Sequence, residues 1–128
     1  MKKNIILLTG DELRHKYFAS FLASYLSINL KLTVHESNIK LKKNILYKKD
    51  ELIKKHVDLR NKEEILSFKE FIKKSKKYNF IKIKNGNIND EKVINLIKKE
   101  KFDYIVSYGC SIINSRFINQ FKNNFLNI

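Results

Sequence analysis

The stretch NIILLTG, residues 4–10, decides the fold. It is a continuous apolar run that ends at a glycine, which is typical of a strand buried on both faces of a parallel sheet. From Asp11 onward the apolar residues take a helical spacing, which predicts a helix directly after this strand. Thr9 and Glu12 have the spacing of a capping box at the helix start. The apolar stripe of this helix consists of Leu13, Tyr17, Phe18, Phe21, Leu22, Tyr25 and Leu26.

The rest of the chain repeats this alternation of short apolar strands and helical stretches. Further strands are predicted over residues 30–36, 79–86, 102–109 and 124–128. Helices are predicted over residues 48–77, in one bent or two consecutive pieces, over 87–101 and over 114–123. Such alternation favours right-handed βαβ units. We therefore expect an α/β, Rossmann-like three-layer fold with a mostly parallel five-stranded sheet, in one domain over residues 1–128.

Two details of the helix over residues 87–101 can also be predicted. Asn89 or Asp90 is a plausible N-cap, because a short polar side chain there can accept a hydrogen bond from a free backbone N–H group. Val93, Leu96 and Ile97 recur at helical spacing, so we expect these three side chains to face inward.

The glycines mark where a ligand would bind. Gly10, Gly86 and Gly109 are the only glycines in the chain, and each follows or ends a predicted strand. In open parallel sheets, ligands bind at the carboxyl ends of the strands, near the point where strand order reverses. If the order is 3-2-1-4-5, that point lies between the first and fourth strands. The crevice is then bounded by residues 9–11 and 108–111.

Composition narrows the setting of the protein. Cys110 is the only cysteine, so an internal disulfide is excluded and a reducing, cytoplasmic compartment is the default expectation. No apolar run approaches the roughly 20 residues needed to cross a bilayer. The first residues carry two lysines and a short apolar run, which is too brief for a signal peptide. We therefore expect no membrane association.

The formal net charge of +14, from 27 Lys and Arg against 13 Asp and Glu, has two readings. Such a charge attracts polyanions, so a small basic α/β module that binds RNA or phosphorylated ligands is one candidate function. Compositional bias is the simpler explanation, because the basic residues are nearly all Lys. Arginine, which specific phosphate and base recognition usually needs, occurs only as Arg14, Arg60 and Arg116. We therefore do not expect nucleic acid as a partner, although the charge permits it.

Other motifs argue against common chemistries. The turn TGDELRH, residues 9–15, has one glycine where a dinucleotide fingerprint has three, and Asp11 and Glu12 occupy the helix N-terminus that a pyrophosphate would need. No spacing of His, Cys, Asp or Glu predicts a metal site. Cys110 with His15 as its base could act as a nucleophile, but a free cysteine near a strand end is more often a packing residue.

The middle helix carries a ladder of four residues spaced four apart: His56, Arg60, Glu64 and Phe68. If the helix is continuous, they lie on one face. The ladder is then either a set of side-chain pairs on the surface that ends in one hydrophobic residue, or a basic surface that faces a phosphorylated substrate. The spacing does not decide between them.

The stretch DYIVSYGCSII, residues 103–113, is the most informative for a ligand. A buried strand leads into a glycine turn and then into two isoleucines before the next helix. Such a loop presents backbone N–H and C=O groups between apolar side chains, which suits a flat heterocycle held by main chain. It is equally compatible with an ordinary loop between a strand and a helix.

The order of these elements and motifs resembles the folate-dependent formyltransferases, a family that includes methionyl-tRNA, glycinamide ribonucleotide and sugar N-formyltransferases. The resemblance is clearest over residues 87–128. There the family's acidic "D-I-N-D" helix start, "D-x-I-V-x-x-G" strand, "I-I" loop and short helix correspond to NIND, DYIVSYG, SII and NSRFINQF. The final strand, NNFLNI, matches the family strand that ends in Asn-x-His.

The resemblance implies transfer of a formyl group from N10-formyltetrahydrofolate to an amine-bearing small molecule, possibly phosphorylated, such as a sugar nucleotide. Asn127 matches the catalytic Asn. Gly10, Arg14 and His15 are expected on the acceptor side. The resemblance places the pterin against the main chain of Tyr108, Gly109, Cys110, Ser111, Ile112 and Ile113.

The family's catalytic His would follow Ile128, and none of His15, His35 or His56 occupies that position. The downstream catalytic Asp has no counterpart either. We therefore expect the 128 residues to form an incomplete, truncated formyltransferase domain that is catalytically incompetent as given.

Overall fold

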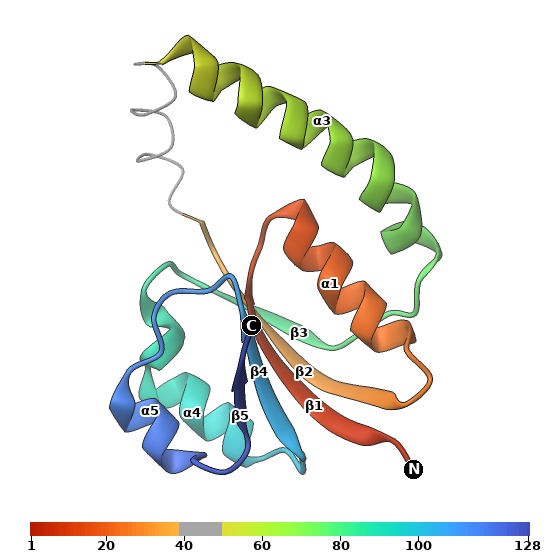
Figure 1. The fold of residues 1–128 in the computed structure, drawn as a ribbon. Helices are drawn as coiled ribbons and strands as arrows, with labels where there is room; N and C mark the ends of the chain where they lie inside the picture. The colour runs from red at the N-terminus through yellow and green to blue at the C-terminus, as the bar shows by residue number, and fades with distance from the viewer. Residues whose placement is uncertain (39–49) are drawn as a thin grey trace.

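Five parallel strands form a single sheet in the computed structural model, which describes residues 1–38 and 50–128 (Figure 1). The strand order is β3-β2-β1-β4-β5, with every neighbouring pair parallel. The strands are β1 (Lys3–Gly10), β2 (Ile28–Glu36), β3 (Phe80–Ile83), β4 (Tyr104–Tyr108) and β5 (Phe125–Asn127). The predicted α/β, Rossmann-like fold is thus confirmed, and so is the reversal of strand order between β1 and β4.

Helices cover both faces of the sheet (Figure 1). One side carries α1 (Leu13–Ser24), with α3 (Glu51–Lys74) lying outside it. The other side carries α4 (Glu91–Lys98) and α5 (Ser115–Gln120), and a 3-10 turn, η1 (Asn87–Asn89), precedes α4. Among the described helices, none combines the length and the apolar character needed to cross a membrane.

Strand β1 lies at the centre of the sheet and contributes to two cores. Ile6 and Leu8 pack on the side of α4 and α5, whereas Ile5 and Leu7 pack on the side of α1. All four are at most 6% exposed. Because successive side chains of a strand point to opposite faces, a strand buried on both faces must be apolar at every position. This is why residues 5–8 of that stretch are apolar without interruption.

The capping box predicted from Thr9 and Glu12 is wrong. Thr9 still belongs to β1, and its hydroxyl donates a 2.6 Å hydrogen bond to the backbone oxygen of Tyr108 on β4. Glu12 is itself the N-cap of α1, and its capping-box partner is His15. The capping box therefore begins three residues later than predicted, because β1 extends as far as Gly10.

Other predicted boundaries were close, with differences at the ends. The described part of the middle helix is one unbroken helix, and residues 48 and 49 of its predicted start lie outside the described residues. Asp90 is the N-cap of α4, as predicted, although its side chain makes no capping hydrogen bond. Val93 and Ile97 face the core as expected. Ile94 is also fully buried, whereas Leu96 is only half-buried.

Helix α3 rests on α1 through aromatic side chains. None of its residues is buried. Tyr17 of α1 stacks on Phe68 with ring centroids 4.3 Å apart and lies 5.0 Å from Phe71, while Phe21 lies 6.5 Å from Phe71. A helix that buries so little of its own surface depends on these few contacts for its position.

We therefore expect Phe71→Ala to loosen α3 without unfolding the sheet. Loss of two ring contacts, worth roughly 0.5–1.5 kcal/mol each beyond area burial, should speed amide hydrogen exchange in α3 about tenfold or more, while β1 keeps its protection. Leu66→Ala is the matched control, because Leu66 is on the same helix and 78% exposed. Equal exchange rates in the two variants would contradict this anchoring role.

Candidate functional site

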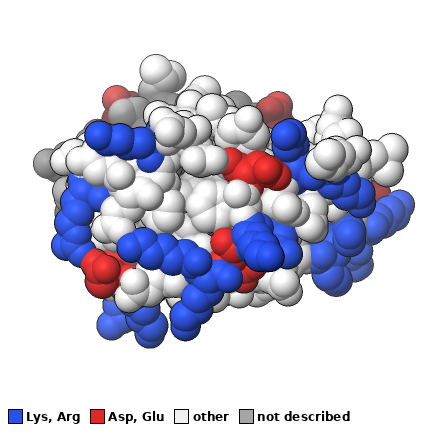
Figure 2. Space-filling model, turned by 90° about the horizontal axis from the view of Figure 1, so that it is seen from below, with Lys and Arg blue, Asp and Glu red and all other residues white. Residues whose placement is uncertain are grey.

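Basic residues are spread over the surface rather than gathered in one stripe on the face shown in Figure 2. On that face Lys and Arg lie at several separate places, and Asp and Glu lie between them. A protein that tracks a polyanion usually presents a continuous positive groove. This face therefore gives no support to a dedicated nucleic-acid surface.

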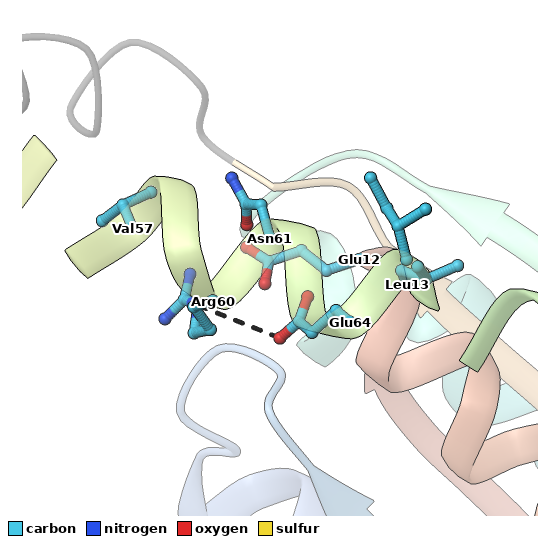
Figure 3. A pocket seen from close by; sticks show the side chains of 7 residues that line it. Glu12, Leu13, Val57, Arg60, Asn61 and Glu64 are labelled. Atoms are coloured by element: carbon cyan, nitrogen blue, oxygen red, sulfur yellow. Dashed lines mark ion pairs between the residues drawn. The ribbon is translucent and has the colours of Figure 1, made fainter. Parts of the chain in front are cut away.

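Three cavities follow one another along the carboxyl edge of the sheet. The first, about 390 Å³, lies between the start of α1 and α3, and its lining includes Glu12 and Leu13 of the former and Arg60 and Glu64 of the latter (Figure 3). The second, about 260 Å³, is the crevice between the ends of β1, β2 and β4. The third, about 340 Å³, lies between the loop after β4 and the end of β5.

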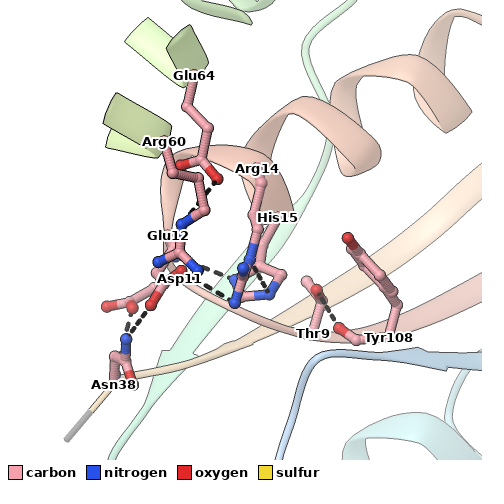
Figure 4. A network of polar contacts seen from close by, with 9 residues as sticks. All are labelled: Thr9, Asp11, Glu12, Arg14, His15, Asn38, Arg60, Glu64 and Tyr108. Carbon is pink, nitrogen blue, oxygen red and sulfur yellow. Dashed lines mark hydrogen bonds and ion pairs between the residues drawn. The ribbon is translucent and has the colours of Figure 1, made fainter. Parts of the chain in front are cut away.

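The crevice brings together the residues predicted for the acceptor side. Gly10, Arg14 and His15 all line it, together with residues 109–111. Figure 4 shows the polar contacts around it, which include Arg14 with its neighbours and, beneath the surface, Thr9 with Tyr108. The Arg14 guanidinium lies 3.1 Å from the Glu12 carboxylate. The predicted crevice and its acceptor-side residues thus share one place in the fold.

His15 fills the space that two glycines leave open. The imidazole is only 4% exposed. A Cβ atom on Gly10 would lie 2.5 Å from its Cε1 and Nδ1 atoms, and a Cβ atom on Gly109 would lie 2.3 Å from Nε2. Gly109 also has φ of +69°, a conformation that L side chains rarely adopt. The glycines at the ends of β1 and β4 are therefore required by the packing of one side chain.

The surroundings of His15 favour its neutral form. Nδ1 lies 3.2 Å from the backbone nitrogen of Glu12, and Nε2 lies 3.4 Å from Nε of Arg14. Both neighbours are donors, and an imidazolium has no lone pair with which to accept from either. Burial and, secondarily, the Arg14 guanidinium lower the pKa of His15. A neutral imidazole can accept at one nitrogen only, so only one of these two contacts can be a full hydrogen bond.

A second buried imidazole, His35 at the end of β2, escaped the sequence-based predictions. It is 2% exposed, with Nδ1 2.7 Å from the backbone oxygen of Gly10 and Nε2 3.0 Å from the hydroxyl of Tyr78. The neutral tautomer with hydrogen on Nδ1 satisfies both contacts, because it donates to the carbonyl and accepts from the phenol. Burial lowers the pKa of His35. Burial also raises the pKa of Tyr78, which therefore keeps its proton.

Glu36, the last residue of β2, was also missed. Its carboxylate is buried, with the residue 3% exposed. Oε1 accepts a 2.7 Å hydrogen bond from the backbone N–H of Ser111, and Oε2 accepts a 3.1 Å bond from that of Gly86. One side chain thus joins the ends of β2, β3 and β4. A carboxylate that closes a strand of alternating apolar residues was the only available signal in the sequence.

The loop predicted to hold a pterin lines the third cavity. Its lining includes Gly109, Cys110, Ser111, Ile112 and Ile113, together with Asn127 of β5. Tyr108 differs from the rest. Its ring packs against Phe18 and His15 of α1, at centroid distances of 4.8 Å and 5.5 Å, and its backbone oxygen accepts from Thr9.

Hydrogen bonds fix the shape of this loop. Besides the bond from Ser111 to Glu36, the Asn89 side chain donates to the backbone oxygen of Ile112 at 2.9 Å and accepts from the backbone N–H of Asn114 at 2.9 Å. A loop held in this way is preorganised. Part of its main chain is already occupied, so a ligand would have to use its other backbone groups.

Cys110 lacks the features of a nucleophile. Burial and, secondarily, the nearby Glu36 carboxylate raise the pKa of the thiol to about 11. The thiolate that attacks or binds metal is therefore scarce at neutral pH. In the described part of the chain, no three His, Cys, Asp or Glu side chains lie close enough to hold a metal ion. Cys110 instead packs against the core beside α4 and α5.

Three members of the predicted ladder on α3 make contacts along the helix or with α1, whereas the fourth is exposed. Nε of Arg60 lies 3.8 Å from the Glu64 carboxylate, and Phe68 stacks on Tyr17, whereas His56 is exposed. Arg60 and Glu64 line the first cavity.

Comparisons with protein-family models, curated proteins and solved structures yield no match. Membership of the formyltransferase family therefore stays a prediction from the sequence.

The packing of His15 predicts unequal costs for alanine at two glycines. Gly109→Ala should lower the free energy of unfolding by roughly 2–4 kcal/mol, because left-handed strain of about 1–2 kcal/mol adds to overpacking against His15. Gly86→Ala is the matched control: φ is +85°, but no atom lies within 4 Å of its Cβ position. Its free energy of unfolding should fall only by the cost of the left-handed strain, about 1–2 kcal/mol.

Chemical denaturation measures both losses. Introducing His15→Ala together with Gly109→Ala should return the cost of the alanine at 109 to that of the control. Equal losses at the two glycines in the otherwise unchanged chain would contradict the packing role of His15.

The two buried histidines predict that stability falls on mild acidification. Their folded-state pKa values lie below the ordinary 6.5, so the unfolded chain takes up protons first as the pH falls below that value. The stability that they contribute is complete above pH 6.5 and is lost towards lower pH. The slope should approach at most about 1.4 kcal/mol per pH unit for each histidine.

Urea denaturation between pH 7.5 and pH 5.5 measures this slope. His35→Gln and His15→Gln should each flatten it, whereas His56→Gln, a change on the exposed surface of α3, should not. A slope that survives the loss of both buried histidines would refute this assignment.

Proposed function

We propose that this chain is the folate-binding part of a formyltransferase, which transfers a formyl group from N10-formyltetrahydrofolate to an amine. One observation carries the proposal: Asn127 and the loop 109–113 line one cavity, while Gly10, Arg14 and His15 line the next. The two cavities share the wall formed by Gly109, Cys110 and Ser111. The donor and acceptor sites would therefore adjoin each other at this turn of main chain.

The orientation of the Asn127 amide suits this role. Its Oδ1 accepts a 2.6 Å hydrogen bond from the hydroxyl of Ser107 on β4. With the oxygen held there, the NH₂ group is the part of the amide that remains available to the cavity. Donors aimed at a developing oxyanion are the usual means of stabilising acyl transfer, and loss of one typically costs about 10²–10³ in rate.

The volume of the third cavity is compatible with the pterin end of the reduced folate that would supply the formyl carbon. Its volume of about 340 Å³ lies at the lower end of the range typical of small-molecule sites, roughly 300–1,000 Å³. Ile113, Ile118 and Phe125 give it apolar walls, and the loop 109–113 adds main-chain groups. A flat heterocycle with polar edges needs this combination.

Proton transfer needs a further group. No histidine lines the third cavity among the described residues. The cavity therefore offers an oxyanion donor without an imidazole beside it, and we expect the 128 residues to bind folate without fast transfer.

The competing proposal is a basic module for RNA or phosphorylated ligands, and the net charge of +14 is its support. Such binding weakens steeply with salt because it releases counterions. Titration of a single-stranded RNA at two salt concentrations separates the proposals. Tight binding with a steep salt dependence favours the module, and weak binding favours the formyltransferase.

A reduced folate should bind the third cavity. We expect 5-formyltetrahydrofolate, a stable probe, to give a saturable heat in calorimetric titration. Ile112→Asp should weaken binding about tenfold or more, equivalent to about 1.4 kcal/mol, because it places a carboxylate at the apolar rim. Ile112 is 90% exposed, so the fold should tolerate the change.

Leu26→Asp is the control. Leu26 is 86% exposed and precedes β2, so it lies at the opposite edge of the sheet. Absence of any folate binding by the unaltered chain, or equal weakening by the two substitutions, would overturn the proposed function.

A further inference from the structure

Helix α3 exposes a straight row of leucines on the side that faces away from α1. Leu52, Leu59 and Leu66 are 77%, 61% and 78% exposed. The half-buried residues of α3, which include Phe68 and Phe71, mark the side that packs on α1. Each residue turns a helix by about 100°, so Leu66 lies about 160° from Phe68 around the axis, on the opposite side. Figure 1 shows α3 outside α1, so this row also faces away from the sheet.

The spacing of seven residues keeps the leucine row narrow. Seven residues fall about 20° short of two full turns, so the three leucines span only about 40° of the helix surface over a length of about 21 Å. A helix that lies on a membrane presents a broader apolar face. A single row at seven-residue spacing is instead the pattern of a coiled-coil seam, which packs against another helix.

Opposite charges border the leucine row on its two flanks. Lys62 and Lys69 each follow a lysine-free turn on one flank, three residues after a leucine of the row or its predecessor, and both are exposed. Glu63 and Glu70 directly follow these lysines in the chain and are exposed as well. Because adjacent residues lie about 100° apart on a helix, each glutamate falls on the other flank from the lysine before it. The seam is therefore basic on one side and acidic on the other over its second half.

These flanks are complementary to a second copy of the same helix in parallel orientation. A twofold axis along two parallel helices turns the lysine flank of each copy towards the glutamate flank of the other, so Lys62 lies opposite Glu63 of the second copy and Lys69 opposite Glu70. An antiparallel pair would place lysines opposite lysines and glutamates opposite glutamates. Charge thus selects the parallel arrangement.

We propose that two copies of this chain associate through α3, as a parallel two-stranded coiled coil whose seam is Leu52, Leu59 and Leu66. Charged residues occupy the other core position of each heptad, where an apolar residue is usual, so the association is weak. A short interface of this kind should give a dissociation constant on the order of 10–100 μM. The association does not depend on the proposed formyltransferase function.

Sedimentation velocity of the 128-residue chain tests the association, over concentrations that bracket this constant and at an ionic strength of about 0.15 M. We expect a monomer–dimer equilibrium. Leu59→Lys should weaken the dimer about tenfold or more, because it buries two like charges at the centre of the seam. Leu26→Lys is the matched control: it adds the same charge at a leucine that is 86% exposed outside α3, and it should leave the equilibrium unchanged.

Exchange of the flanking charges tests the orientation. Lys62→Glu with Lys69→Glu should weaken the dimer about fivefold or more, and so should Glu63→Lys with Glu70→Lys, because each pair of changes places like charges opposite each other on both flanks. All four changes together should restore the dimer. The two pairs of changes shift the net charge of the chain in opposite directions, so general repulsion cannot weaken the dimer in both variants.

Amide hydrogen exchange gives a second measurement. Helix α3 rests on α1 through a few aromatic contacts, so a partner helix should slow exchange in α3 as the protein concentration rises. Exchange in the central strand β1 should not change with concentration.

Four other outcomes would each overturn the inference. A chain that stays monomeric over the whole range has no such interface. A dimer that survives Leu59→Lys uses another surface. A dimer that responds to Leu59→Lys but not to the charge exchanges is not parallel. A monomeric chain that binds vesicles of phosphatidylglycerol and phosphatidylcholine through Leu59 uses the leucine row on a membrane surface instead.

Discussion

The buried carboxylate of Glu36 is the contact on which the carboxyl edge of this fold depends. Removing a charge from water costs several kcal/mol unless hydrogen bonds replace its hydration. Here two backbone N–H groups do so, one from the turn after β3 and one from the loop after β4. Because each of these bonds involves an ionised acceptor, each is stronger than a bond between neutral groups. Three strand ends, and the loop that faces Asn127, are thereby fixed relative to one another.

His15 plays the corresponding role between β1 and β4. Its ring occupies the place that side chains at Gly10 and Gly109 would need, and the Thr9 hydroxyl joins the same two strands beside it. The crevice is thus held by one buried acid and one buried neutral imidazole. Neither is required to react, and both position the main chain that borders the cavities.

Much of the architecture was predictable because it follows from local patterns. The apolar run of residues 4–10 identified the central strand, and the glycines marked the strand ends where the cavities lie. The residues assigned to the acceptor side and the loop 109–113 were also brought to neighbouring cavities. Glu36 and His35 could not be identified in this way, because their partners are 75 and 43 residues away in the chain. Nε of Arg60 is likewise shielded from solvent without a hydrogen-bond partner among the described residues, and no spacing within α3 reveals this.

Helix α3 is attached to the outside of α1 by a few rings and contributes no buried residue to either core. Helix α3 is therefore a replaceable part of the fold. Its sequence can diverge or be replaced with little effect on the sheet, provided that Tyr17 and Phe21 of α1 and their aromatic partners are kept. A fold built in this way can change one peripheral helix while the strand ends, which Glu36 and His15 hold together, keep their geometry.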